Sequence, residues 1–246
     1  MLKKIVLLFI LALFANASGI KVAVAANVSF AINDLISLFN SKYRDIKVNV
    51  ILGSSGKLNA QIKRGAPFDV FMAANMRYPQ DLYDNALAFG PPKIYAQGGL
   101  AIFSTKQRDF SKGIYIVKER SISRVAIANP NTAPYGKAAA EALKHANIYS
   151  EIKDKLVYAE SISQTVQYAM TAADIGFIAK SSLFSSKMKK FKKDKNWIEV
   201  NKSLYTPIKQ GAIIIKATKN LKEAKEFYNF IFSKEAKKVF KKYGYL

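Results

Sequence analysis

The apolar residues of positions 21–74 alternate between the period of a strand and the period of a helix. Three short apolar runs have the length of buried strands: residues 21–25, 48–52 and 70–74. Between these runs, apolar residues recur every three or four positions, as on one face of a helix: Ile32, Leu35, Ile36 and Phe39 in the first interval, and Leu58 and Ile62 in the second. This β-α-β-α-β order predicts a parallel sheet covered by helices.

A second unit of the same kind begins after Gly98-Gly99, which we interpret as a hinge. Its expected strands are residues 100–103, 124–128, 156–158, 175–179 and 197–200. Its expected helices are residues 136–146 and a segment that starts at Ser161. Residues 204–210 are expected to be the return crossover, followed by an apolar strand at 211–215 that rejoins the first unit. We therefore expect two α/β domains, the first formed by residues 18–98 and 206–246 and the second by residues 99–205.

Four strand-to-helix turns carry hydrogen-bond donors, two in each unit. They are Asn27 with Ser29, Ser54 with Ser55, residues 132–135, and Ser161 with Ser163. In open α/β sheets, ligands bind beyond the carboxyl ends of the strands, and a helix N-terminus offers free N–H groups to an anion. If the two units face each other across a cleft, the sequence predicts an anion site where these turns meet.

The turn at residues 53–58, Gly-Ser-Ser-Gly-Lys-Leu, has two other interpretations. A nucleotide P-loop requires glycine where Ile51 stands and serine or threonine where Leu58 stands, so that interpretation fails. A plain helix cap by Ser54 or Ser55 is compatible with the sequence, because serine is a preferred N-cap residue. Only the recurrence of similar turns favours the anion site over the cap.

Composition adds the cellular context. Lys3 and Lys4 followed by the apolar run 5–14 and Ala15-Asn16-Ala17 predict a signal peptide at residues 1–17, and thus an exported, periplasmic protein. The chain has no cysteine, which excludes disulfides, thiolate metal sites and a lipoprotein anchor. Its 39 basic residues against 17 acidic ones give a formal charge of +22. The basic residues are mostly lysine, whereas nucleic-acid recognition relies on arginine, so we expect no nucleic-acid partner.

Catalytic and metal-binding chemistry have little support in the sequence. The single histidine, His145, has no sequence partner, and no Gly-x-Ser-x-Gly motif is present, so a serine hydrolase using Ser54 or Ser55 is the weaker alternative. Metal-ligand spacing is absent as well, and we expect no cofactor.

Turns that offer only donors suit a fully ionised tetrahedral dianion, whose oxygens only accept hydrogen bonds. Sulfate-, molybdate- or tungstate-like ions are therefore favoured over hydrogen phosphate.

Several motifs together resemble the periplasmic molybdate-binding proteins of ABC importers, a family of type II two-domain binding proteins. They are Val24-Ala25-Ala26-Asn27, Gly53-Ser54-Ser55-Gly56-Lys57-Leu58, the run Gln61 to Phe71, Asn129-Pro130 with Ala133-Pro134-Tyr135-Gly136, Ser161-Ile162-Ser163-Gln164, Ile175-Gly176-Phe177-Ile178-Ala179 and Lys242-Tyr243-Gly244-Tyr245. The resemblance covers residues 20–246. It implies two mostly parallel, helix-flanked sheets with the ligand in the interdomain cleft.

The resemblance also implies a ligand set and a function. The oxyanion ligands would be Asn27, Ser55, Tyr135 and Ile162, with Ala26 and Ser54 as secondary contacts. Asn27 would donate through its side-chain amide and its backbone N–H. Some family members add a tyrosine where this chain has Ala179, and the Tyr135 phenol is a substitute. The implied protein is a monomer that binds molybdate or tungstate, delivers it to a membrane permease and catalyses no reaction. Binding of sulfate or another small oxyanion is the alternative.

Overall fold

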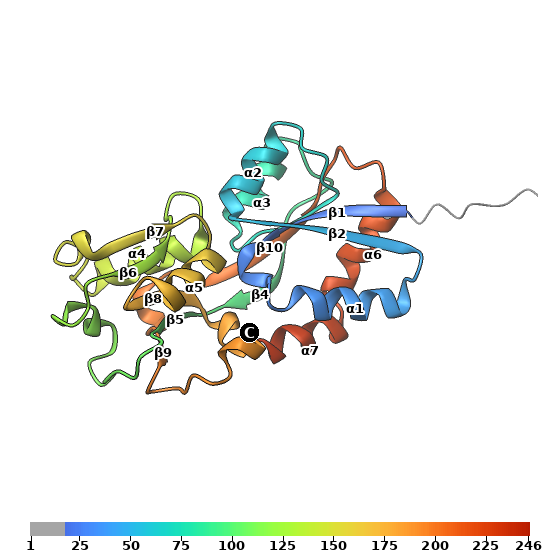
Figure 1. Cartoon of the computed structure of the whole chain (residues 1–246). Helices are drawn as coiled ribbons and strands as arrows, with labels where there is room; N and C mark the ends of the chain where they lie inside the picture. Colours follow the sequence, from blue (N-terminus) through green and yellow to red (C-terminus); the bar gives the residue numbers. More distant parts are fainter. Residues whose placement is uncertain (1–17) are drawn as a thin grey trace, which may run out of the picture.

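Two five-stranded sheets, each covered by helices, form two lobes that lie side by side (Figure 1). The strand order is β2-β1-β3-β10-β4 in the first sheet and β7-β6-β8-β5-β9 in the second. The computed structural model describes residues 18–246, so the predicted signal peptide lies outside the described residues. The predicted α/β fold with two helix-flanked sheets is confirmed.

The first lobe places two strand-to-helix turns at one edge of its sheet. Its strands are β1 (Ser18–Ala25), β2 (Ile46–Gly53), β3 (Val70–Met72), β4 (Lys93–Gly98) and β10 (Ile208–Ile214). Its helices are α1 (Ile32–Lys42), α2 (Ser55–Lys63), α3 (Arg77–Asp84), α6 (Leu221–Ile231) and α7 (Lys234–Lys242). Strands β1 and β2 are parallel and end in register, with Ala25 opposite Gly53. The short 3₁₀ helix η1 (Ala26–Val28) and helix α2 therefore begin next to each other.

The second lobe repeats this arrangement. Its strands are β5 (Leu100–Phe103), β6 (Val125–Ala128), β7 (Leu156–Ala159), β8 (Ile175–Ala179) and β9 (Trp197–Glu199). Its helices are α4 (Pro134–His145) and α5 (Ile162–Thr171), with 3₁₀ turns η2 (Gly113–Lys118), η3 (Lys153–Lys155), η4 (Lys180–Phe184), η5 (Ser186–Met188) and η6 (Lys202–Leu204). Strands β6 and β7 are parallel, with Ala128 opposite Ala159, so α4 and α5 also start at a common edge.

The return crossover differs from the sequence prediction. Strand β10 begins at Ile208, within the segment expected to be the return crossover, and not at Gly211. Ile208 pairs with Gly98 and Gln210 with Ala96, so strand β4 supplies the backbone partners. The polar side chains of Lys209 and Gln210 interrupt the apolar run, so the pattern of apolar residues did not predict this part of the strand.

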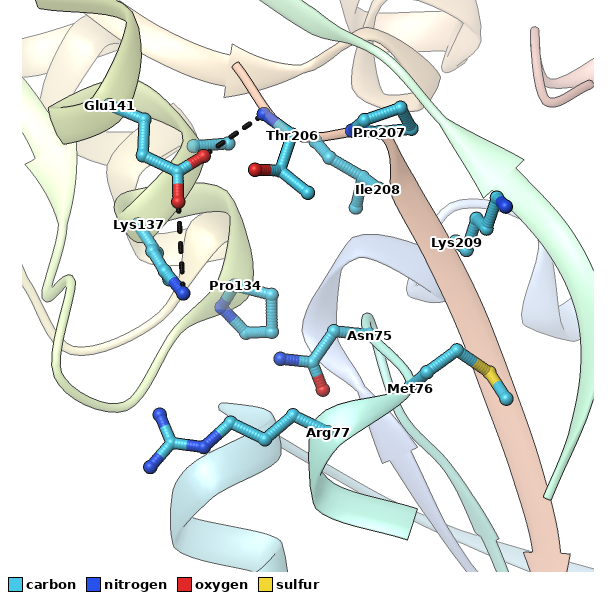
Figure 2. A pocket seen from close by; sticks show the side chains of 11 residues that line it. Asn75, Met76, Arg77, Pro134, Lys137, Glu141, Thr206, Pro207, Ile208 and Lys209 are labelled. Carbon is cyan, nitrogen blue, oxygen red and sulfur yellow. Dashed lines mark hydrogen bonds and ion pairs between the residues drawn. The ribbon is translucent and has the colours of Figure 1, made fainter. Parts of the chain in front are cut away.

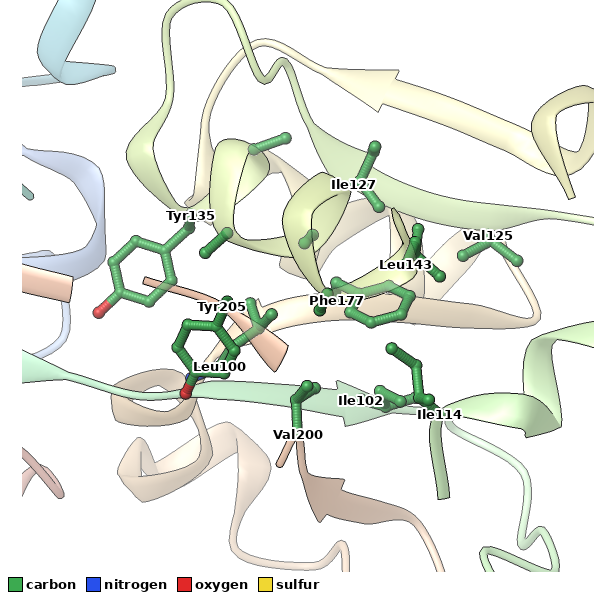
Figure 3. Packing of buried hydrophobic residues seen from close by; sticks show 14 of the residues in the cluster. Leu100, Ile102, Ile114, Val125, Ile127, Tyr135, Leu143, Phe177, Val200 and Tyr205 are labelled. Carbon is green, nitrogen blue, oxygen red and sulfur yellow. The ribbon is translucent and has the colours of Figure 1, made fainter. Parts of the chain in front are cut away.

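Each sheet packs its helices over apolar clusters, and the cluster around the second sheet extends to Ala25, Ala26 and Ala74 of the first lobe. Around the second sheet, Ile102, Val125, Leu143 and Phe177 are fully buried together (Figure 3). Tyr135 stands at the margin of this cluster, and its hydroxyl points out of it (Figure 3). Within residues 18–246, no helix is long and apolar enough to cross a bilayer.

Candidate anion-binding site

A small cavity lies where the four strand-to-helix turns meet. It is lined from the first lobe by Ala25, Ala26, Asn27, Gly53, Ser54, Ser55 and Ala74, and from the second by Ala133, Pro134, Tyr135 and Ile162. All six residues predicted as ligands or secondary contacts are among them. No lining residue is ionised near neutral pH. The volume, about 10 Å³, is far below the roughly 300–1,000 Å³ of pockets for organic ligands. It has room for about one water molecule, so a tetrahedral oxyanion would enter only if the walls move slightly apart.

Backbone N–H groups give the cavity its character as an anion site. The first N–H groups of a helix have no acceptor within that helix. Among residues 18–246, no other backbone carbonyl accepts from the N–H groups of Asn27, Ser55, Tyr135 or Ile162. Three of these residues stand in the first turns of α2, α4 and α5, where the helix dipole favours negative charge.

Two side-chain oxygens of the cavity residues also lack a partner. Within residues 18–246, the buried side-chain atoms without a hydrogen-bond partner are Ser54 Oγ, Asn27 Oδ1 and Asn59 Oδ1. Buried polar groups are nearly always paired in folded proteins. Two unpaired atoms on residues of one small cavity therefore point to a polar ligand there.

The two neighbouring serines differ in their contacts. Ser54 occupies the N-cap position of α2, yet its side chain makes no capping hydrogen bond. Ser55 Oγ accepts from the Ala74 backbone N–H at 2.9 Å, which leaves its own hydrogen free to donate. At the fourth turn, Ser161 does cap its helix, because Ser161 Oγ accepts from the Gln164 N–H at 3.3 Å. The simple cap interpretation thus describes Ser161 and not Ser54.

The side chain of Asn27 is held by a buried network that the sequence did not reveal. Asn27 Nδ2 donates to Gln210 Oε1 at 2.8 Å and to the Tyr245 hydroxyl at 3.0 Å. In this arrangement the amide donors face the network, contrary to the expectation that they face the ligand. Gln210 Nε2 donates to the Tyr135 hydroxyl at 3.2 Å, so Tyr135 offers the cavity its backbone N–H and its phenol is bound to Gln210.

Burial keeps the tyrosines of this network protonated. Loss of water around the hydroxyl raises the pKa of Tyr135 and of Tyr95 well above 10. The same effect raises the pKa of Tyr245 to about 12. Near neutral pH the network therefore contains only neutral donors and acceptors.

Contacts between the lobes surround the cavity. The Gly56 backbone N–H donates to Thr132 O at 2.8 Å, and the Tyr78 hydroxyl donates to Asn131 O at 3.1 Å. Lys57 Nζ lies 2.7 Å from Glu160 Oε1 in an exposed ion pair. The two lobes are consequently held together by contacts made next to the residues that line the cavity.

A larger pocket of about 310 Å³ lies beside the cavity, between the start of α3, helix α4 and strand β10 (Figure 2). Pro134 lines both. Glu141 accepts from the Thr206 N–H at 3.0 Å and lies 3.7 Å from Lys137 Nζ, so these three groups of the pocket are paired with one another (Figure 2). Arg77 and Pro134 place the starts of α3 and α4 at this pocket. The small cavity is the better candidate, because the starts of α2, α4 and α5 meet there beside two unpaired buried side-chain oxygens.

His145 lies far from both serines. It ends helix α4, and Tyr135 near the start of that helix lines the cavity. Ten residues at a rise of about 1.5 Å separate them by roughly 15 Å. His145 Nδ1 is hydrogen-bonded to Leu204 O at 2.8 Å, so it forms no dyad with Ser54 or Ser55.

Comparisons with known proteins agree with this geometry. Residues 20–246 match the family described as bacterial extracellular solute-binding protein. The chain is 35% identical to the molybdate-binding protein ModA of Rhodobacter capsulatus, over 96% of this chain and 91% of the relative. It is also 35% identical to the protein of that name from Azotobacter vinelandii, over 96% of this chain and 93% of the relative.

Solved structures share the fold. The periplasmic molybdate-binding protein of Azotobacter vinelandii superposes with a TM-score of 0.86 at 29% identity, over 92% of this chain and 98% of that chain. The sulfate-binding protein SubI of Mycobacterium tuberculosis superposes with a TM-score of 0.74 at 14% identity, over 93% of this chain and 86% of that one. At that identity the second likeness concerns the fold alone.

Proposed function

The chain belongs to the bacterial extracellular solute-binding proteins, and from this premise we propose that it captures molybdate, and tungstate with it, and delivers the ion to the permease of an ABC importer. The relatives that are 35% identical over nearly the whole chain carry the name of molybdate-binding proteins. The two lobes, residues 18–98 with 206–246 and residues 99–205, close on the ion in the periplasm.

The observation that carries the proposal is the neutral cavity with converging donors. Asn27, Ser55, Tyr135 and Ile162 each have a backbone N–H group without a backbone acceptor among residues 18–246. Ser54 adds an unpaired hydroxyl, and Ser55 adds a hydroxyl hydrogen. A tetrahedral dianion accepts hydrogen bonds through every oxygen, so its four oxygens match these donors. Ala26 contributes only to the shape of the wall.

The proposal includes no reaction, no cofactor and a monomeric protein. The separation of His145 from both serines favours a binding role over the serine hydrolase alternative. Selectivity over sulfate would come from the size of the cavity, because molybdate is the larger ion. Ala179 is buried and carries no hydroxyl, so it adds no side-chain donor for the ligand.

Titration calorimetry with molybdate, tungstate, sulfate and phosphate tests the proposal. We expect one ion per chain, tight binding of molybdate and tungstate, weaker binding of sulfate and the weakest binding of hydrogen phosphate. Tight binding of sulfate without molybdate would replace the proposal by the alternative oxyanion. Turnover of ester substrates that disappears in a Ser55→Ala variant would instead support the hydrolase.

A further inference from the structure

Gln210 connects the two walls of the cavity without lining it. Its side chain is fully buried on strand β10. Gln210 Oε1 accepts from Asn27 Nδ2 and from the Tyr95 hydroxyl, each at 2.8 Å, and Gln210 Nε2 donates to the Tyr135 hydroxyl at 3.2 Å. One amide thus contacts a candidate ligand residue from each lobe.

The network in this orientation leaves groups unused. Asn27 Oδ1 has no donor among residues 18–246. Across the same residues, the hydrogen of the Tyr135 hydroxyl has no acceptor, because Gln210 presents its Nε2 to that oxygen. Each unpaired buried group has an energetic cost. An amide oxygen would also repel a fully ionised oxyanion.

A half-turn of both amides removes these defects, provided that the Tyr245 hydroxyl, 3.0 Å from the Asn27 amide, turns its hydrogen from Asn27 O to Asn27 Oδ1. Asn27 O would keep the hydrogen bond that it accepts from Ser181 Oγ at 3.0 Å. Gln210 Nε2 would then donate to Asn27 Oδ1 and to the Tyr95 hydroxyl, while Gln210 Oε1 would accept from the Tyr135 hydroxyl. The Tyr95 hydroxyl already lies 3.2 Å from Ala73 O, to which it can donate. The Asn27 NH₂ group would be left free for a ligand.

The two amides must turn together. A half-turn of Asn27 alone would place two oxygens 2.8 Å apart, and a half-turn of Gln210 alone would place two NH₂ groups at that distance. The orientation of Gln210 therefore determines whether Asn27 leaves a donor or an acceptor unpaired.

We propose that Gln210 is a positioning residue that turns the Asn27 NH₂ group toward the bound ion and so selects fully deprotonated oxyanions over protonated ones. The inference rests on the proposed function, since it concerns the same cavity. Molybdate and sulfate only accept hydrogen bonds near neutral pH. Hydrogen phosphate must also donate one, and a cavity whose Asn27 presents NH₂ offers it no carbonyl or carboxylate oxygen as acceptor, only the hydroxyls of Ser54 and Ser55.

The direct test is neutron diffraction from deuterated protein crystals with bound molybdate. We expect deuterium on the Asn27 amide atom that is not bonded to Gln210, and on the Gln210 atom that faces Asn27. Deuterium on the Asn27 atom that faces Gln210 instead would overturn the inference, even if molybdate is bound as proposed.

A pair of matched variants gives a second test in solution. In Gln210→Glu, the ionised carboxylate offers Asn27 only hydrogen-bond acceptors. It therefore draws the Asn27 NH₂ group away from the ligand. Gln97→Glu adds the same charge on the neighbouring strand β4. At about pH 8 molybdate and hydrogen phosphate carry equal charge, so the ratio of their affinities is insensitive to the added charge.

We expect Gln210→Glu to shift this ratio toward phosphate by roughly tenfold or more, as expected for one exchanged hydrogen bond to an ion. Gln97→Glu should leave the ratio unchanged. An unchanged ratio in folded Gln210→Glu would overturn the inference while the proposed function stands. Absence of molybdate binding by the unaltered protein would overturn both. If Gln210→Glu does not fold, the neutron experiment decides.

Discussion

Ser54 and Ser55 are adjacent, yet their hydroxyl groups make different hydrogen-bond contacts in the protein without ligand. Ser54 Oγ is buried and unpaired, whereas Ser55 Oγ accepts a hydrogen bond from the Ala74 N–H at 2.9 Å. Removal of the first hydroxyl leaves no protein group without a partner. Removal of the second leaves a buried N–H group unpaired. The two positions can therefore separate ligand binding from stability.

Alanine substitution of each serine should reveal this difference. We expect both Ser54→Ala and Ser55→Ala to weaken molybdate binding by about 1–3 kcal/mol, since each removes a donor to a buried charge. Only Ser55→Ala should lower the free energy of unfolding without ligand, by about 1–3 kcal/mol for the unpaired Ala74 N–H. Calorimetry and urea unfolding measure the two effects. Equal loss of stability in both variants would contradict the assignment.

At the same scale, the sequence indicated the residues at the turns but not those behind them. Asn27 and Ser55 follow parallel strands, so topology alone brings them to one edge. Gln210 contacts Asn27 across 183 positions and Tyr135 across 75. No local pattern signals such contacts, because hydrogen-bond partners at that separation are fixed only by the completed fold.

Among the elements, the helix N-termini are held in place by close approach to neighbouring backbone. A Cβ atom at Gly136, in the first turn of α4, would lie 2.1 Å from Ala128 O at the end of β6. Gly56, in the first turn of α2, has equally little space on the other side of the cavity. A Cβ atom there would lie 2.9 Å from Thr132 O and 2.7 Å from the Tyr78 hydroxyl.

Gly56→Ala should therefore hinder closure of the lobes without touching the cavity. We expect molybdate affinity to fall by about 1–3 kcal/mol, the usual cost of overpacking. Stability without ligand should change little, because the lobes can part at this contact, the end of the Tyr78 side chain can move aside, and alanine favours the helix by roughly 0.5–1 kcal/mol. Calorimetry and thermal unfolding check both.

Gly90→Ala is the matched control, since a Cβ atom at Gly90 would have open space around it. This control should bind molybdate like the unaltered protein. Unchanged affinity in Gly56→Ala would show that the contact with Thr132 is not part of the bound state.

The elements themselves were largely predictable from the spacing of apolar residues. The start of β10 was missed because two polar residues stand there, the exposed Lys209 and the buried Gln210, which faces a hydrogen-bond network. The 3₁₀ turns, such as η2 at Gly113–Lys118, have too few residues for a period to emerge. Hydrophobic periodicity identifies an element that is buried on one face and exposed on the other. A strand with a buried polar side chain and a 3₁₀ turn that is too short to show a period both lack this pattern.

For the whole molecule, the two lobes are joined close to the cavity and carry a strong positive charge. The formal charge of the chain is +22. The lysine-rich segment 187–195 contributes six lysines, all of them exposed: Lys187, Lys189, Lys190, Lys192, Lys193 and Lys195. None of these lines the cavity, whose wall is neutral. The charge can therefore act on the ligand only through the long-range field.

Because the charged lysines lie away from the neutral cavity, we expect salt to change the association rate of molybdate more than its dissociation rate. A positive field raises the local concentration of anions by about tenfold or more at low salt, and the screening length shortens from about 30 Å at 0.01 M to about 10 Å at 0.1 M. We expect the association rate in stopped-flow experiments to fall by roughly tenfold over that range. The dissociation rate should change little, because buried donors are screened much less.

Replacing the six lysines by glutamine should flatten the salt dependence of the association rate without altering the dissociation rate. An association rate that is independent of salt would mean that the net charge has no part in capturing the ion.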